Sequence, residues 1–320
     1  MNRSTKGLLL AASAVAVPAT INALIASRVG MMTQPLPGDI GYYDWIYGRV
    51  AFYRLGQGPP LLLVHNPNAG ASAWEWRKVF PELANNFTVY ALDLLGFGLS
   101  EKPNVPYSGG MYAELVHDFL EDVVGQRASA IGSGLGASYL VNIAVRRPEM
   151  LDRLVIVNPT GTTSMLSAPA RGITHGVLDA PILGTSIYNS IVSMRGIEQE
   201  LNLHVYYDPT FVTPDMVQYL YVAAHQRGSR HAAAAFISGR LDLPMRMAFA
   251  DISQPVLIIW GRDAYYTPIG DAADLLYRNP KARLQIFDDC GALPQDEKAG
   301  EFIRTARDFF FELDLGEKAA

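Results

Sequence analysis

The residues whose types and spacing most clearly suggest catalysis form a short glycine-rich turn. Residues 132–136 read Gly-Ser-Gly-Leu-Gly, after a predicted strand over 128–132 and before a helical pattern over 135–146. In a strand–turn–helix of the form Gly-x-Ser-x-Gly, the third residue is a serine that attacks a carbonyl group. Gly134 occupies that third position, because only tiny residues fit two places before and two places after it. The sequence therefore predicts an intact turn without its nucleophile, and the alternative is that Ser133 attacks from a shifted turn.

This turn has to be held by a sheet, and the rest of the chain supplies one. Short apolar runs predict buried strands over Leu61–His65, Phe87–Leu94, 128–132, Leu154–Asn158, Pro255–Trp260 and Leu284–Asp288. Helical patterns separate most of these runs, so we predict an α/β fold with a mostly parallel central sheet and helices on both faces. The alternation stops over 161–247, which we interpret as an inserted helical lid. The core is then predicted over 41–160 and 248–320.

A family resemblance supports this arrangement. The segment Tyr90–Pro103 reads YALDLLGFGLSEKP and follows a predicted strand. It resembles the corresponding turn in haloalkane-dehalogenase-like and chlorophyll-ester-hydrolase-like members of the α/β-hydrolase superfamily, and the resemblance extends over about residues 40–313. It implies the α/β-hydrolase fold, a catalytic nucleophile, acid and histidine in fixed loops, and an oxyanion hole after the first parallel strand.

The oxyanion turn departs from the family pattern. Members of the family usually read His-Gly-x, and the resemblance implies that the backbone N–H of x helps to hold the oxyanion. This chain reads His65-Asn66-Pro67, and proline has no backbone N–H. Loss of one such donor costs about 10²–10³ in rate in working enzymes. The second donor, the N–H of Leu135, is expected to remain.

The acid and base loops also depart from the family. The resemblance places the acid at Ala264, between Gly261 and Pro268, and the base at Ala292. Asp263 lies one place before the acid position and could serve only if the loop were remodelled. No histidine follows His231 in the sequence, so no imidazole can occupy the loop after the last strand. Activation of a serine needs a positioned imidazole or an equivalent base.

Other residues were weighed for binding or metal chemistry. Four aromatic residues, Trp74, Trp76, Tyr265 and Tyr266, occupy positions that surround the active-site cleft in the family. They either pack in the core or line a pocket for an apolar small molecule. The lid histidines 204, 225 and 231 could hold a metal or replace the lost base, but ordinary surface or core positions are favoured. We therefore expect no metal and no cofactor.

The N-terminus predicts an attachment to a membrane. Residues 7–26 carry no charge, and a bilayer core needs about 20 apolar residues to be spanned by a helix. We predict a transmembrane anchor over 1–28 and a linker over 29–40, with a cleaved signal peptide or an arm packed on the domain as alternatives. Positive charge at Arg3 and Lys6 favours a domain outside the cytoplasm.

Composition limits the partners and the redox chemistry. Lys and Arg number 26 against 31 Asp and Glu, for a net charge of −5, and no long basic run occurs. This balance argues against a nucleic-acid partner. The single cysteine, Cys290, cannot form an internal disulfide and is interpreted as a buried structural thiol.

The changed catalytic positions and the predicted anchor lead to one hypothesis. It is a catalytically inactive, membrane-anchored α/β-hydrolase-like protein that acts as a scaffold or accessory subunit of a membrane complex, or as a binder of an apolar molecule. The alternative is an atypical, esterase-like serine hydrolase that uses Ser133 or a remodelled site.

Overall fold

The central strands are apolar on both sides because helices cover both faces of the sheet. In the computed structural model, β3 (Pro60–Val64) is buried along its whole length. Leu62 and Val64 join one core cluster, and Leu61 and Leu63 join the other. The structure describes residues 3–160 and 168–312, with side chains over 16–160 and 172–312. A central sheet covered by helices on both faces confirms the α/β fold predicted from the sequence.

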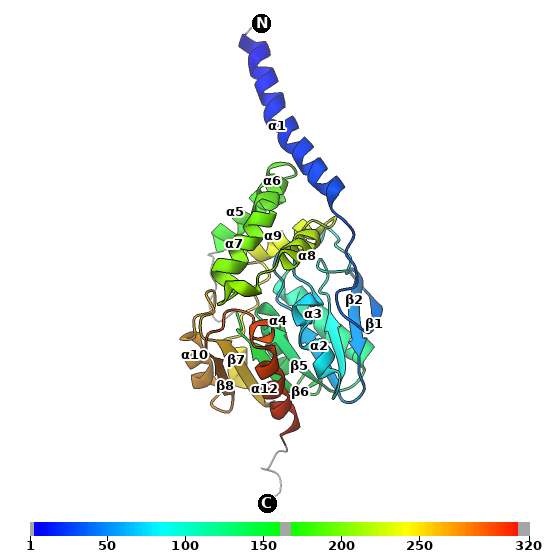
Figure 1. The fold of residues 1–320 in the computed structure, drawn as a ribbon, viewed down its shortest axis with the longest axis vertical. Coiled ribbons are helices and arrows are strands. Elements are labelled where there is room, and N and C mark those ends of the chain that lie inside the picture. Colours follow the sequence, from blue (N-terminus) through cyan, green and yellow to red (C-terminus); the bar gives the residue numbers. More distant parts are fainter. Residues whose placement is uncertain (1–2, 161–167, 313–320) are drawn as a thin grey trace, which may run out of the picture.

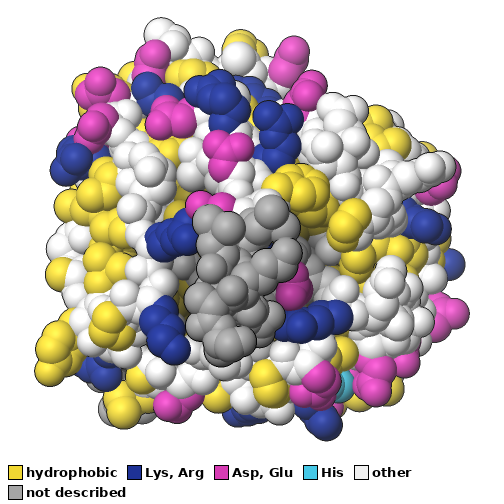
Figure 2. All heavy atoms as spheres, turned by 90° about the horizontal axis from the view of Figure 1, so that it is seen from below, with side chains coloured by type: hydrophobic (Ala, Val, Ile, Leu, Met, Phe, Trp, Pro, Cys, Tyr) yellow, Lys and Arg dark blue, Asp and Glu magenta, His cyan; other side chains and the backbone are white. Residues whose placement is uncertain are grey.

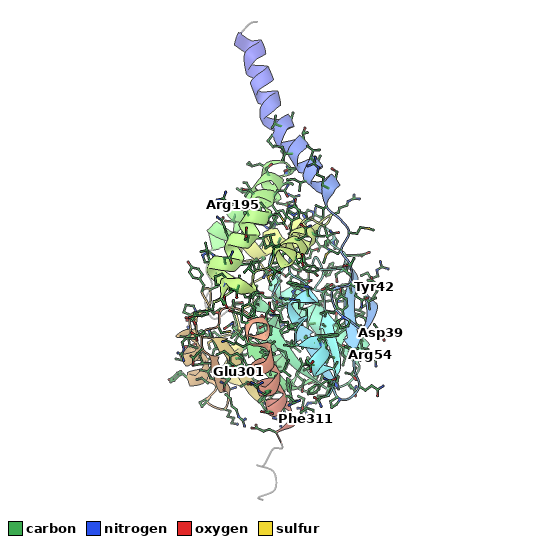
Figure 3. The ribbon with its side chains drawn as sticks, in the orientation of Figure 1. Asp39, Tyr42, Arg54, Arg195, Glu301 and Phe311 are labelled. Carbon is green, nitrogen blue, oxygen red and sulfur yellow. The ribbon has the colours of Figure 1, made fainter. Side chains whose placement is uncertain are left out.

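The sheet has eight strands in the order β1-β2-β4-β3-β5-β6-β7-β8. The remaining bounds are β1 (Asp39–Trp45), β2 (Gly48–Leu55), β4 (Thr88–Leu92), β5 (Ala128–Ser133), β6 (Leu151–Val157), β7 (Val256–Gly261) and β8 (Arg283–Phe287). The edge strand β1 pairs antiparallel with β2, β2 also pairs antiparallel with β4, and every later pairing is parallel. Asp39 lies opposite Arg54 in the edge hairpin, and both are labelled there in Figure 3.

Helices pack on each face of the sheet through the two core clusters. One face carries α3 (Gly109–Phe119), η2 (Leu120–Val124), α4 (Leu135–Arg146), η5 (Ala248–Asp251) and α10 (Asp271–Arg278). The other face carries η1 (Ala73–Trp76), α2 (Phe80–Leu83) and α12 (Ala299–Phe311), while the short α11 (Pro294–Glu297) precedes α12. Because the parallel strands share one carboxyl edge, the turns after β5, β6, β7 and β8 meet there.

Residues 168–247, between β6 and β7, form a helical layer above that edge, which we call the lid (Figure 1). It contains α5 (Ala168–Asp179), α6 (Leu183–Ile191), α7 (Met194–Glu200), η3 (Leu201–Val205), η4 (Pro209–Phe211), α8 (Pro214–Ala224) and α9 (Ser229–Ile237). The lid has a small apolar core of its own, which includes Tyr188, Tyr206 and Val217. That separate core allows the lid to be an insertion that leaves the sheet intact.

The predicted membrane anchor is wrong. Residues Arg3–Arg28 form one helix, α1, but within the described part of the chain no helix is long and apolar enough to cross a membrane. Lack of charge misled the prediction, because Pro18, Thr20 and Asn22 interrupt the apolar side chains. The Asn22 amide donates to Ser186 Oγ at 3.1 Å and to the carbonyl of Ile182 at 3.3 Å, so α1 packs against α6. The predicted single-pass membrane localisation is withdrawn with the anchor.

The face away from the lid carries charges of both signs. Figure 2 shows Lys and Arg side chains close to Asp and Glu side chains over the part of this face that is described. Figure 3 places Glu301 and Phe311 of α12 toward this end, and Arg195 at the opposite end in the lid. Interspersed charges of opposite sign produce no extended field of one sign.

Candidate active site at the carboxyl edge of the sheet

The glycine-rich turn has the tight geometry that its sequence predicts. Gly134 connects β5 to α4 with φ +53° and ψ −117°, a conformation that strains residues with a side chain. A Cβ atom on Gly132 would lie 2.7 Å from the Ala137 nitrogen, and one on Gly136 would lie 2.5 Å from the Val64 carbonyl oxygen. The turn is therefore closed around both flanking glycines, and Gly134 stands at its apex.

The side chain of Asn66 fills the space above Gly134. A Cβ atom on Gly134 would meet Asn66 Oδ1 at 2.5 Å. The same oxygen accepts a hydrogen bond of 3.1 Å from the backbone N–H of Leu135. The predicted oxyanion residues Asn66 and Leu135 are thus in contact, but the Leu135 N–H is already engaged as a donor to Asn66 Oδ1. Pro67 is buried and contributes no N–H.

A carboxyl group that the sequence analysis missed lies next to Ser133. Glu75 of η1 accepts hydrogen bonds from the Asn66 N–H at 3.1 Å and from Gln295 Nε2 at 2.8 Å. Ser133, buried at the end of β5, lies close enough to this carboxyl group for its hydroxyl to lower the pKa of Glu75. Burial raises the pKa of Glu75 to about 7, and these hydrogen bonds oppose the increase. Nearby Asp296 raises the pKa of Glu75 further.

Asn158 joins the turn to the two loops where the acid and the base were sought. Its Nδ2 donates to the carbonyls of Ala292 at 2.9 Å and Gly291 at 3.3 Å, and its Oδ1 accepts from the Gly261 N–H at 3.0 Å. It follows Val157, whose carbonyl accepts from the Gly134 N–H at 3.0 Å. The turn and both loops therefore meet at one edge.

The side chains on these loops offer little reactivity. Ala264 is buried and Ala292 is half-buried, and neither carries an ionisable group. Asp263 is exposed, and its backbone N–H donates to the carbonyl of Cys290 at 2.9 Å. The Cys290 thiol is buried, and burial raises its pKa well above the ordinary value, so it is no nucleophile at neutral pH.

The histidines do not replace the missing base. His65 is buried, its Nε2 accepts from the Leu94 N–H at 3.1 Å, and burial lowers its pKa, so it is a neutral structural residue. In the lid, His204 contacts Glu200 and His225 contacts the carbonyl of Tyr221. Within the described residues, no hydrogen bond joins a histidine to Ser133, and no group of side chains could hold a metal ion.

A cavity of about 510 Å³ lies between η1 and the lid helices η4 and α8. Its walls include Trp74, stacked on Tyr219 with ring centroids 4.6 Å apart. Of the four aromatic candidates, only Trp74 lines this cavity. Trp76 is fully buried in the core, while Tyr265 and Tyr266 are exposed and pack against His204. Neither Ser133 nor Glu75 lines the cavity.

A buried ionic cluster connects this cavity to the site. Asp296 binds Arg77 and Lys78, each with a nitrogen–oxygen distance of 2.6 Å, and accepts a hydrogen bond from the Tyr206 hydroxyl of the lid. Arg77 and Lys78 also line the cavity. The cluster fixes η1 between the base loop and the lid, so it holds Glu75 in place.

Sequence reasoning missed Glu75 because it examined only the family's motif positions, although an acid between two tryptophans was a visible signal.

Comparisons with known proteins place these observations in a wider group. The family model described as "Alpha/beta hydrolase family" matches residues 61–305. The 2-hydroxymuconate semialdehyde hydrolase of Pseudomonas sp. (strain CF600) is 30% identical over 275 residues, which cover 83% of this chain and 92% of that protein. The 2-hydroxy-6-oxo-6-phenylhexa-2,4-dienoate hydrolase of Comamonas testosteroni is 26% identical, covering 81% of this chain and 90% of that protein.

A solved structure shows the same fold. The meta-cleavage product hydrolase of Pseudomonas fluorescens IP01, solved as a variant with bound acetates, has a TM-score of 0.71 and 23% identity, covering 85% of this chain and 97% of that chain. The sequence relatives are named as hydrolases, so the predicted inactive protein and its scaffold or accessory role are wrong. That prediction tested only the motif positions and overlooked the carboxyl group beside Ser133.

Proposed function

Because this chain belongs to the alpha/beta hydrolase family, we propose that it is an atypical serine hydrolase that cleaves an ester or a related acyl bond. Ser133 is the nucleophile and Glu75 is the general base. The observation that carries this proposal is the contact of the Ser133 hydroxyl with a carboxyl group whose pKa is about 7. A general base works best when its pKa lies near the operating pH, and a carboxylate can fulfil this role.

The proposed reaction forms and breaks bonds in two stages. The Glu75 carboxylate takes the proton of Ser133 as Oγ attacks the carbonyl carbon, and the carbonyl oxygen becomes an oxyanion. The leaving group departs with that proton, which leaves an acyl ester on Ser133. Water then attacks this ester while Glu75 takes a proton from the water, and Glu75 returns that proton to Ser133 Oγ as the acid product leaves.

Asn66 supplies the proposed oxyanion contact together with Leu135. In the resting structure the Leu135 N–H donates to Asn66 Oδ1. Rotation of the Asn66 side-chain amide would free the Leu135 N–H. It would also turn Asn66 Nδ2 toward the position that the oxyanion takes beside this N–H. Asn66 Nδ2 has no hydrogen-bond partner among the described residues, so the rotation breaks no Nδ2 hydrogen bond to them. The Leu135 N–H and Asn66 Nδ2 would then form a pair of oxyanion donors, which Pro67 cannot complete because it has no N–H.

The relatives suggest which substrates to test first. Two are named for 2-hydroxymuconate semialdehyde and for 2-hydroxy-6-oxo-6-phenylhexa-2,4-dienoate, and the latter name describes a carboxylate with a conjugated ketone. Trp74 and Tyr219 provide flat apolar walls in the nearby cavity, and Lys78 provides a positive charge. These walls suit the part of such a substrate that lies away from the bond that is cleaved.

Kinetics on two substrate classes tests the proposal. The protein is assayed with a 4-nitrophenyl ester and with a hydroxy-oxo-dienoate, and Ser133→Ala is expected to abolish turnover of the accepted substrate. Glu75→Gln is expected to lower kcat by about 10²–10⁴. The exposed residues Ser190 and Glu114 provide matched controls, and Ser190→Ala and Glu114→Gln should retain full activity.

Covalent labelling gives an independent measurement. A fluorophosphonate probe should label the wild-type protein at Ser133, and Ser133→Ala should remain unlabelled. The proposal is overturned if the wild-type protein turns over neither substrate class. It is also overturned if Ser133→Ala retains the wild-type rate, because the nucleophile must then be another group.

A further inference from the structure

A second cavity, of about 280 Å³, lies between the lid and the core, and its lining contains none of the proposed catalytic residues. The core contributes the loop 104–106. The lid contributes His175 and Asp179 from α5, His231 from α9, and Arg240, which follows α9. Groups that can carry a positive charge therefore gather at a junction of two structural units.

The guanidinium group that lines this cavity belongs to Arg240, an exposed residue. Within the described part of the chain it makes no hydrogen bond and no ion pair, although its positive charge lowers the pKa of His175. Arg230, which lies in α9, differs from Arg240 because it donates to the carbonyls of Leu178, Asp179 and Ala180. Arg240 is thus an exposed cation that lines the cavity and has no anionic partner among the residues that the structure describes.

The two imidazoles are held only loosely. His175 Nδ1 lies 3.4 Å from Ser238 Oγ, and His231 Nδ1 lies 3.8 Å from Asp179 Oδ1. Partial burial lowers the pKa of both imidazoles, and Arg240 and Arg230 add to the effect, while Asp179 opposes it. Both rings are therefore mostly neutral near pH 7, and a bound anion would favour their protonated forms.

We propose that this cavity is a binding site for a small oxyanion, held by Arg240, His175 and His231. A guanidinium group presents a planar fork of donors that matches phosphate and carboxylate oxygens. Asp179 pairs with His231 and stabilises its protonated form, so one acid in the cavity assists the site. The ligand is either an inorganic or organic phosphate or a small carboxylate, since both offer the same oxygens.

The position of the cavity gives binding a structural consequence. A ligand there contacts α5 and α9 of the lid and the loop 104–106 of the core at once. The carbonyl of Arg240 already accepts from the Gly109 N–H at 3.3 Å, so the lid and the core touch beside it. Binding would fasten the lid to the core and stabilise the folded protein by mass action.

Titration with inorganic phosphate at constant ionic strength tests the site, with the melting temperature and calorimetry as measurements. Phosphate is expected to raise the melting temperature more than sodium chloride does, and more strongly at pH 6 than at pH 8. Arg240→Gln should weaken the affinity by about tenfold or more. Arg195 is an exposed lid arginine that does not line this cavity (Figure 3), so Arg195→Gln is the matched control and should bind as the wild type does.

The remaining outcomes are decisive in either direction. Binding of acetate or succinate in place of phosphate, with the same dependence on Arg240, supports the site and identifies a carboxylate ligand. Absence of binding by phosphate and by both carboxylates overturns the proposal. Equal losses in the Arg240 and Arg195 variants also overturn it, because they would indicate a general effect of charge. Ser133→Ala should bind phosphate normally, so this test is independent of the proposed hydrolase activity.

Discussion

The partly buried carboxyl group of Glu75 allows a quantitative prediction about stability. Its pKa is about 7 in the folded protein, against an ordinary value of 4.5. One pKa unit corresponds to about 1.4 kcal/mol, so this difference corresponds to about 3 kcal/mol. Between pH 4.5 and 7 the folded state binds this proton more firmly than the unfolded state. The free energy of unfolding therefore decreases by up to about 3 kcal/mol as pH rises through this window, and Glu75 changes it no further above pH 7.

The variant Glu75→Gln lacks this titration, so its stability relative to the wild type should increase with pH. Urea denaturation of both proteins at about pH 5 and about pH 8 measures the difference, and other titrating groups cancel in the comparison. Glu114→Gln, on the exposed side of α3, should show no such trend. A relative stability that is the same at both pH values, within about 0.5 kcal/mol, would refute the argument that burial raises this pKa.

Three further variants examine other parts of the structure. Asn158→Ala removes hydrogen bonds to both loops and should lower the free energy of unfolding by about 2–4 kcal/mol, measured by urea denaturation. Gly134→Ser should destabilise by about 1–3 kcal/mol in the same assay and should not raise ester turnover, because φ is +53° and Asn66 occupies the space. Asn22→Ala should speed tryptic cleavage after Arg28, followed on gels, because α1 loses its hydrogen bonds to α6.

The fold could be predicted from the sequence because its signals are local. The run Leu61–His65 predicts a buried strand, and β3 covers Pro60–Val64. The glycines at 132 and 136 predict a tight turn, and both are closely surrounded by backbone atoms. Burial and steric limits act on each residue in turn, so they leave a pattern that is visible without the structure.

The site was harder to predict because its contacts join distant parts of the chain. Glu75 meets Ser133 and Gln295 only after β5, η1 and the start of α11 come together. No spacing rule relates these positions. The anchor prediction failed for a different reason, since it treated an uncharged segment as an apolar one and overlooked Asn22.

Asn66 decides whether the proposed site can work. The free-energy cost of displacing its Oδ1 can be compared with the gain from an oxyanion donor. Its Oδ1 must leave the Leu135 N–H before a substrate oxygen can enter. An intramolecular hydrogen bond contributes about 0.5–1.5 kcal/mol, so displacement costs about that much. An oxyanion donor contributes about 2.7–4 kcal/mol to the transition state. The gain exceeds the cost, so Asn66 closes the resting site with a contact that a developing oxyanion can displace.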